Sequence, residues 1–179
     1  MDTYGLEIFK YLTIPKNYVV AKQIAERIYS VDEQLKSEFW ETVEDVLKKK
    51  VSPKFQFDSD DANFYIYKAT WQDTSVALEK GTLDFGVCLT RMLFEIDPVV
   101  ELAKQLPKEL PNLESGNKDW LCWQKIDNVN TYRFNQSETL IRILPESRDV
   151  LVNEFVEFVL NYLQELESFC DAIQRYHMS

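Results

Sequence analysis

The sequence contains little glycine and a single histidine. Four of its 179 residues are glycine, so we expect neither a glycine-rich phosphate-binding loop nor many tight hairpins. The histidine, His177, stands two residues before the last residue, where we expect the chain to fray. Because serine and cysteine nucleophiles need a base beside them, we do not expect a Ser–His or Cys–His catalytic pair.

The cysteines are also few, and no long apolar run occurs. Cys88, Cys122 and Cys170 are odd in number, far apart and flanked by apolar residues. This pattern fits neither a disulfide framework nor a zinc site, so we predict reduced core cysteines. The sequence lacks a run of about 18 apolar residues and a basic segment that could open a secretory signal. We therefore predict a cytoplasmic protein without a membrane segment, a metal or a cofactor.

Basic residues are outnumbered, since 20 Lys and Arg face 30 Asp and Glu, for a formal net charge of -10. The excess lies in residues 51–100, with 4 basic and 8 acidic residues, and in residues 151–179, with 1 and 5. An acidic field disfavours binding to phosphate backbones and anionic membranes. It favours a basic protein partner, or serves solubility alone.

Two helices are predicted in the first fifty residues. Residues 17–30 carry apolar side chains at helical spacing. A second helix is predicted to begin at Ser30, because Ser30 and Glu33 form a capping-box pattern. This second helix ends in Lys48–Lys50, where cations complement the helix dipole.

The middle of the chain has the composition of an antiparallel sheet. Aromatic and β-branched runs, and in one case strict alternation, predict about five strands. Residues 98–106, opened by Pro98, are predicted as one inserted helix. The fold class is therefore α+β, with one domain over residues 1–179 that consists of N-terminal helices over residues 1–50, a sheet over residues 51–136 and C-terminal helices over residues 137–179. The predicted strands are 55–57, 63–71, 83–89, 120–126 and 131–134.

A long C-terminal helix is predicted from Pro145 to about Tyr176, after a short helix that Ser137 caps. Its apolar sector covers about 200°, twice the width of an ordinary amphipathic stripe. Either this helix lies between the sheet and the N-terminal helices, or its flank binds a partner or a second copy, which would make a homodimer. The flank consists of Val152, Val156, Leu160 and Leu163.

Carboxylates offer the only candidates for a metal site. Asp58, Asp60 and Asp61 are similar to the start of a calcium loop, but the loop's glycine and distal glutamate are missing. An acidic hairpin turn is the preferred interpretation. Asp84 could join Asp73 or Glu79 in a two-carboxylate hydrolytic site; a solvated sheet face explains Asp84 equally well.

One strand carries aromatic residues that could stack on nucleic-acid bases. Tyr65, Tyr67 and Trp71 alternate beside Lys68, which suits a single-strand binding surface. The acidic excess of the surrounding residues favours core packing for these side chains instead. Direct binding to nucleic acid is therefore not expected.

Three segments, Glu38–Trp40, Asp119–Asp127 and Leu140–Val152, resemble a known family. They are similar to the C-terminal region that follows the catalytic core in some bacterial PD-(D/E)XK-type defence nucleases. The resemblance covers about residues 30–176 and implies an accessory module. That family also needs an acid-x-Lys triplet on a strand, and Tyr67-Lys68 has the lysine without the acid. No nuclease activity therefore carries over.

Three hypotheses for the function remain. The first is a non-enzymatic acidic protein that binds a basic, nucleic-acid-handling partner, as an inhibitor, immunity or anti-defence protein of bacteria or phages would. The second is an accessory or sensing module related to the nucleases above. The third is a metal-dependent hydrolase with a cryptic carboxylate site. The candidate partner-binding residues are Asp58, Asp60, Asp61, Asp73, Asp84, Glu154, Glu157 and Glu165.

Overall fold

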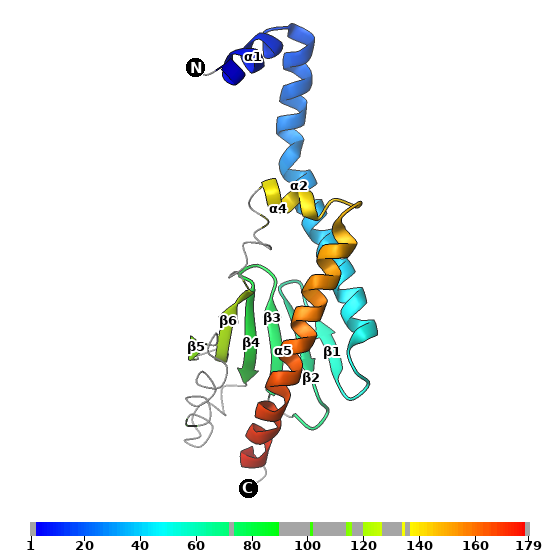
Figure 1. The fold of residues 1–179 in the computed structure, drawn as a ribbon, viewed down its shortest axis with the longest axis vertical. Helices are drawn as coiled ribbons and strands as arrows, with labels where there is room; N and C mark the ends of the chain where they lie inside the picture. The colour runs from blue at the N-terminus through cyan, green and yellow to red at the C-terminus, as the bar shows by residue number, and fades with distance from the viewer. Residues whose placement is uncertain are drawn as a thin grey trace. The chain divides into compact units, whose positions relative to one another are not determined.

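The computed structural model describes residues 3–71, 74–89, 101, 114–115, 120–126, 134 and 137–177. The chain divides into two compact units, Met1–Glu38 (unit 1) and Phe39–Ser179 (unit 2), each considered below by itself. The single domain expected over the whole chain stays a prediction. The elements are α1 (Thr3–Leu12), α2 (Pro15–Lys50), β1 (Gln56–Ser59), β2 (Asn63–Tyr67), β3 (Thr74–Glu79), β4 (Asp84–Leu89), β5 (Glu114–Ser115), β6 (Trp120–Lys125), α4 (Ser137–Arg142) and α5 (Arg148–His177) (Figure 1).

Helix α2 runs without a break from Pro15 to Lys50, so the predicted second helix start at Ser30 is wrong. The Ser30 hydroxyl donates a hydrogen bond of 2.7 Å to the carbonyl of Arg27, one turn back. Glu33 does not reach back to Ser30 but pairs with Lys36 at 2.8 Å. Both contacts are those of a helix interior, where Ser and Glu can form the same sequence pattern as a cap. Helix α1 was not predicted.

The strands form one antiparallel sheet in the order β1-β2-β3-β4-β6-β5. With the N-terminal helices and α5, this confirms the α+β class. Two strands, β3 and β5, were missed. Only Phe134 of the predicted strand 131–134 is described, and it lies in a turn. Only Glu101 of the predicted helix 98–106 is described, and it is helical; the remainder of both segments lies outside the described residues.

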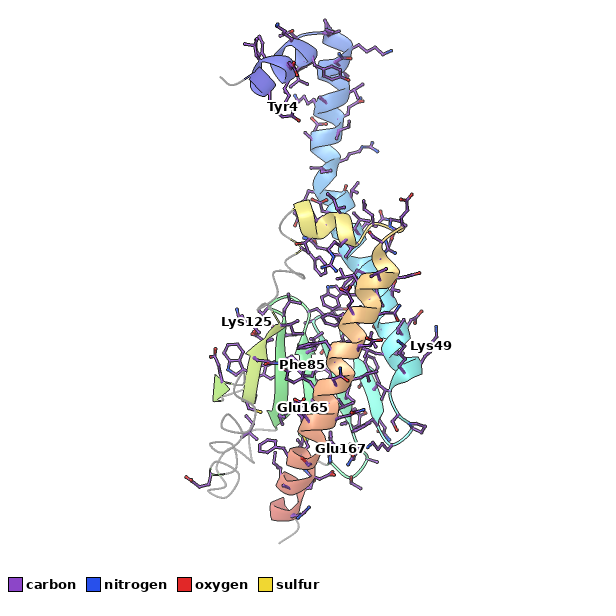
Figure 2. The ribbon with its side chains drawn as sticks, viewed as in Figure 1. Tyr4, Lys49, Phe85, Lys125, Glu165 and Glu167 are labelled. Carbon is purple, nitrogen blue, oxygen red and sulfur yellow. The ribbon has the colours of Figure 1, made fainter. Side chains whose placement is uncertain are left out.

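One face of the sheet packs against α5 and the last turns of α2. Strand register places Phe64 opposite Leu78, and Leu78 opposite Phe85, so these side chains form one row on that face. Phe85 of β4 contacts Phe158 of α5, with ring centroids 6.1 Å apart (Figure 2). These side chains are closely packed, because the void among them has a volume of only about 10 Å³, no more than one water molecule needs.

An aromatic cluster joins α2, β2 and α5 inside unit 2. The ring of Trp40 lies 5.9 Å from Phe64 and 5.4 Å from Phe155, while Phe39 lies 6.2 Å from Phe155. Phe39 and Phe155 are completely buried. Phe39 and Trp40, two of the three residues in the first segment of the nuclease resemblance, are therefore packing residues.

The apolar flank of α5 is part of the same core. Val152, Val156 and Leu163 are buried within the chain, and Leu160 is half-buried. Three of these four side chains are therefore packed within the chain, and the homodimer through this flank stays a prediction. The wide apolar sector arises because α5 contacts the sheet and α2 together. Pro145 belongs to a turn, and α5 begins at Arg148 rather than at Pro145.

Candidate interaction surfaces

The predicted acidic residues lie on three different regions of unit 2. Asp58 is in β1, with Asp60 and Asp61 in the turn that follows, and Asp84 is in β4. Glu154, Glu157 and Glu165 are in α5. Asp73 lies outside the described residues. The structure does not gather these residues into one site, so each group is considered separately.

Asp60 holds the β1–β2 turn together. Its carboxylate accepts hydrogen bonds from the backbone N–H groups of Ala62 (2.8 Å) and Asn63 (2.7 Å), and from the Tyr65 hydroxyl (3.1 Å). The backbone hydrogen bond from Ala62 is the main reason that the pKa of Asp60 is lowered. An aspartate that organises a turn in this way is typical of hairpin connections. The prediction of an acidic hairpin turn is confirmed.

Asp84 and Glu79 are brought together by the register of β3 and β4, where they are direct cross-strand partners. On its other side Asp84 faces Lys125 of β6. One carboxylate oxygen of Asp84, Oδ1, is buried without a hydrogen-bond partner in the described portion of the chain. Within that portion, no group of three or more His, Cys, Asp or Glu side chains could hold a metal ion.

The end of β2 is joined to α5 by a network of charged side chains that the sequence did not reveal. Lys68 Nζ lies 2.7 Å from Asp171 Oδ2 and 2.7 Å from Glu167 Oε1. The Trp71 indole N–H donates to Asp171 Oδ1 at 2.7 Å, and Lys54 pairs with Glu167 at 2.6 Å. These contacts join residues about a hundred positions apart in the chain. We call this set of five residues the α5 clasp.

The clasp shifts the pKa values of its members. Hydrogen bonds from Lys54 and then Lys68 lower the pKa of Glu167. Burial by itself would raise the pKa of Asp171, but the hydrogen bonds from Lys68 and Trp71 outweigh burial and lower it. Burial alone would lower the pKa of Lys68, and the hydrogen bonds to Asp171 and Glu167 outweigh it and raise that pKa. All three shifts favour the charged forms, as a stabilising ion network requires.

The outer face of α5 carries acidic side chains that are not part of the α5 clasp. Glu157 and Glu165 are exposed, and neither forms an ion pair or side-chain hydrogen bond within the described ranges. Glu154 pairs with Arg142 at 2.8 Å, with half of its side chain exposed. Glu165 and Glu167 are two residues apart, yet Glu167 belongs to the clasp while Glu165 faces solvent. We call Glu154, Glu157 and Glu165 the α5 acidic face.

Almost all of the net negative charge of the protein belongs to unit 2. Residues 39–179 contain 15 basic and 24 acidic side chains, whereas residues 1–38 contain 5 and 6. The field that a partner meets near unit 2 is therefore strongly negative, and the field near unit 1 is almost neutral.

Unit 1 exposes large apolar side chains at high density. Of the sixteen large hydrophobic residues that are exposed in the described regions of the chain, thirteen lie in α1, the turn after it and the first half of α2. An open hollow of about 630 Å³ runs along this stretch of α2, between Val20 and Val31. We call the thirteen side chains the N-terminal apolar surface: Tyr4, Leu6, Ile8, Phe9, Tyr11, Ile14, Tyr18, Val19, Val20, Ile24, Ile28, Tyr29 and Val31.

The N-terminal apolar surface is not among the surfaces predicted from the sequence, although its pattern is present there. Val20, Ile24 and Ile28 indicate a helix by their spacing, and α1 was not recognised at all. Tyr18, Val19 and Tyr29 are apolar but lie outside that stripe. A helix with a single packed face does not need apolar residues there.

Comparison with known proteins finds no matching family model, no matching curated protein and no matching solved structure. The resemblance to the accessory region of PD-(D/E)XK-type nucleases therefore stays a prediction. Among the described residues, the helices are too short or too polar to cross a membrane.

Proposed function

We propose that the protein is a non-enzymatic binding protein whose α5 acidic face engages a basic protein partner. The observation that carries this proposal is the division of labour among neighbouring acids of α5. Glu167 and Asp171 are held by Lys68, whereas Glu157 and Glu165 face solvent on the same helix. Acids that the fold does not use, in a unit with 24 acidic and 15 basic residues, are suited to binding a cationic surface.

The rigidity of α5 supports this role. Its buried side is anchored in the core, and Gln174 Nε2 donates to Thr74 Oγ1 of β3 at 3.1 Å in a buried contact. Glu157 and Glu165 are eight residues apart, or about 12 Å along the helix axis. A partner with two cationic groups at that spacing can pair with both without reorganising the helix. Proteins that handle nucleic acid carry such cations for phosphate binding, so an acidic binder of the inhibitor type fits them.

The experiment is affinity capture from native lysate, followed by titration of the purified partner. We expect one stoichiometric basic protein whose association rate falls as salt increases. The variant Glu157→Lys/Glu165→Lys should weaken its binding by at least about tenfold, mainly through slower association. Asp45→Lys/Asp61→Lys, which changes the net charge equally at exposed positions of α2 and the β1–β2 turn, is the matched control and should have a small effect.

Two outcomes contradict the proposal. If no stoichiometric basic partner is captured, the protein is not a binder of this type. If a partner binds equally well to Glu157→Lys/Glu165→Lys and to the unchanged chain, the α5 acidic face is not the binding surface.

A further inference from the structure

Helix α2 carries apolar residues at helical spacing in both units, and these are buried in unit 2 and exposed in unit 1. In unit 2 the stripe consists of Phe39, Val43 and Leu47, each with no exposed surface. Several turns earlier, at the same three- and four-residue spacing, Ile24 is 59% exposed and Ile28 is 51% exposed. Val20, Ile24, Ile28, Val31 and Leu35 fall within an arc of about 80°, the width of an ordinary packed helix face.

The N-terminal apolar surface is large, and the stripe of α2 is one part of it. Exposed side chains of this size present roughly 100 Å² each, so the thirteen together present about 1,300 Å² per copy, of which the stripe of α2 (Val20, Ile24, Ile28 and Val31) supplies about 400 Å². Standard interfaces bury about 800 Å² per partner, and the largest apolar patch on a typical monomer is roughly 300–600 Å². An isolated unit 1 therefore exposes more apolar surface than a monomer ordinarily does.

The charges along this stretch of α2 indicate what covers it. Residues 15–27 contain Lys16, Lys22 and Arg27 with one acid, Glu26, for a net charge of +2. Residues 28–38 contain three acids and one base, for a net charge of -2. Two such helices side by side repel when parallel, because like halves then meet. When antiparallel, the basic half of each meets the acidic half of the other.

We propose that the N-terminal apolar surface binds a second copy of this chain, with the two α2 segments antiparallel about a twofold axis near Ile28. The twofold arrangement puts the same stripe on both sides of the interface, as isologous dimers require. It places Ile24 opposite the partner's Val31, and Val20 opposite the partner's Leu35, so apolar residues meet throughout. This assembly is independent of the α5 acidic face.

The first test is the mass of the full chain in solution. Sedimentation equilibrium from about 1 to 100 μM should give twice the chain mass of 21.2 kDa. Ile24→Glu should weaken self-association by at least about 100-fold, because each dimer then buries two unpaired carboxylates. Ile141→Glu is the matched control, since Ile141 is 61% exposed in α4 of unit 2. It should leave the dimer intact, and circular dichroism should show that both variants fold.

The second test addresses the antiparallel orientation. Lys16→Glu/Lys22→Glu makes both halves of the segment negative, and Asp32→Lys/Glu33→Lys makes both halves positive. Each double variant should be a monomer when alone, and an equimolar mixture should form a heterodimer. If either double variant dimerises alone as tightly as the unchanged chain, the charge argument is wrong.

Other results overturn the proposal itself. A chain that stays at 21.2 kDa over the whole concentration range does not use this surface for a second copy. If that monomer sediments with vesicles of anionic phospholipid, the surface binds a membrane instead. A dimer that Ile24→Glu leaves unchanged is formed by some other surface.

Discussion

Gly86 in β4 is the position where the smallest substitution should have the largest effect on stability. It is paired with Trp123 of β6. A methyl group at its Cα would lie 2.1 Å from the carbonyl oxygen of Cys122 and 2.7 Å from the Cα of Trp123. Both are backbone atoms of the neighbouring strand, so no side-chain rotation can remove the overlap. Gly86→Ala therefore forces β4 and β6 apart.

The magnitude follows from how far the strands must move. Reaching ordinary contact from 2.1 Å requires a local shift of about 1 Å. A shift of that size lengthens the neighbouring ladder hydrogen bonds, at about 1 kcal/mol each, and disturbs the packing of a closely packed sheet, at about 1–3 kcal/mol. We expect a total destabilisation of about 3 kcal/mol, or a melting temperature lowered by roughly 10 °C.

Gly81→Ala is the matched control, because it makes the same chemical change in the β3–β4 turn. A methyl group there meets no atom within 4 Å, and the backbone of Gly81 does not need a positive φ. Both variants change the unfolded chain equally, so their difference isolates the clash in the folded state. Urea unfolding followed by circular dichroism measures that difference. A gap below about 1 kcal/mol would refute the close approach of β4 and β6.

Three further predictions concern unit 2. Asp171→Asn should lower the free energy of unfolding by about 1 kcal/mol at neutral pH, since it removes a partly exposed ion pair with Lys68. Because the pKa of Asp171 is lowered in the fold, this loss of stability should shrink as the pH falls below 3.8, the ordinary pKa of an aspartate. Urea titrations of both proteins at several pH values would show it. Phe155→Ala should cost about 3–5 kcal/mol in the same assay, because the ring is completely buried. Burial raises the pKa of Cys122 to about 12. A thiol reagent at pH near 8 should therefore modify the half-buried Cys88 before the buried Cys122. Mass spectrometry of the labelled peptides would measure the order.

The elements that the sequence predicted well are those whose local pattern agrees with their environment. Strand β4 alternates strictly over Asp84–Leu89 and was recognised. Strand β3 was not, because Ala77 and Glu79 are weak strand formers and the strand is fixed instead by pairing with β2 and β4 on either side. At Ser30 the reverse occurred, since a local capping pattern predicted a helix start where the backbone continues as a helix.

The candidate interaction surfaces could not be predicted to the same degree, because residues of the same type differ there only in what lies beside them in space. Glu165 and Glu167 have the same chemistry and nearly the same sequence position, yet only Glu167 meets the lysines of the clasp. The same limit applies to α2, where Ile24 and Val43 both belong to apolar patterns of helical spacing and differ completely in exposure. Apolar periodicity indicates that a helix has an apolar face. It does not indicate whether the same chain covers that face. The apolar face of α2 that unit 1 leaves exposed is the basis of the proposed dimer, in which a second copy would supply both apolar area and opposite charges.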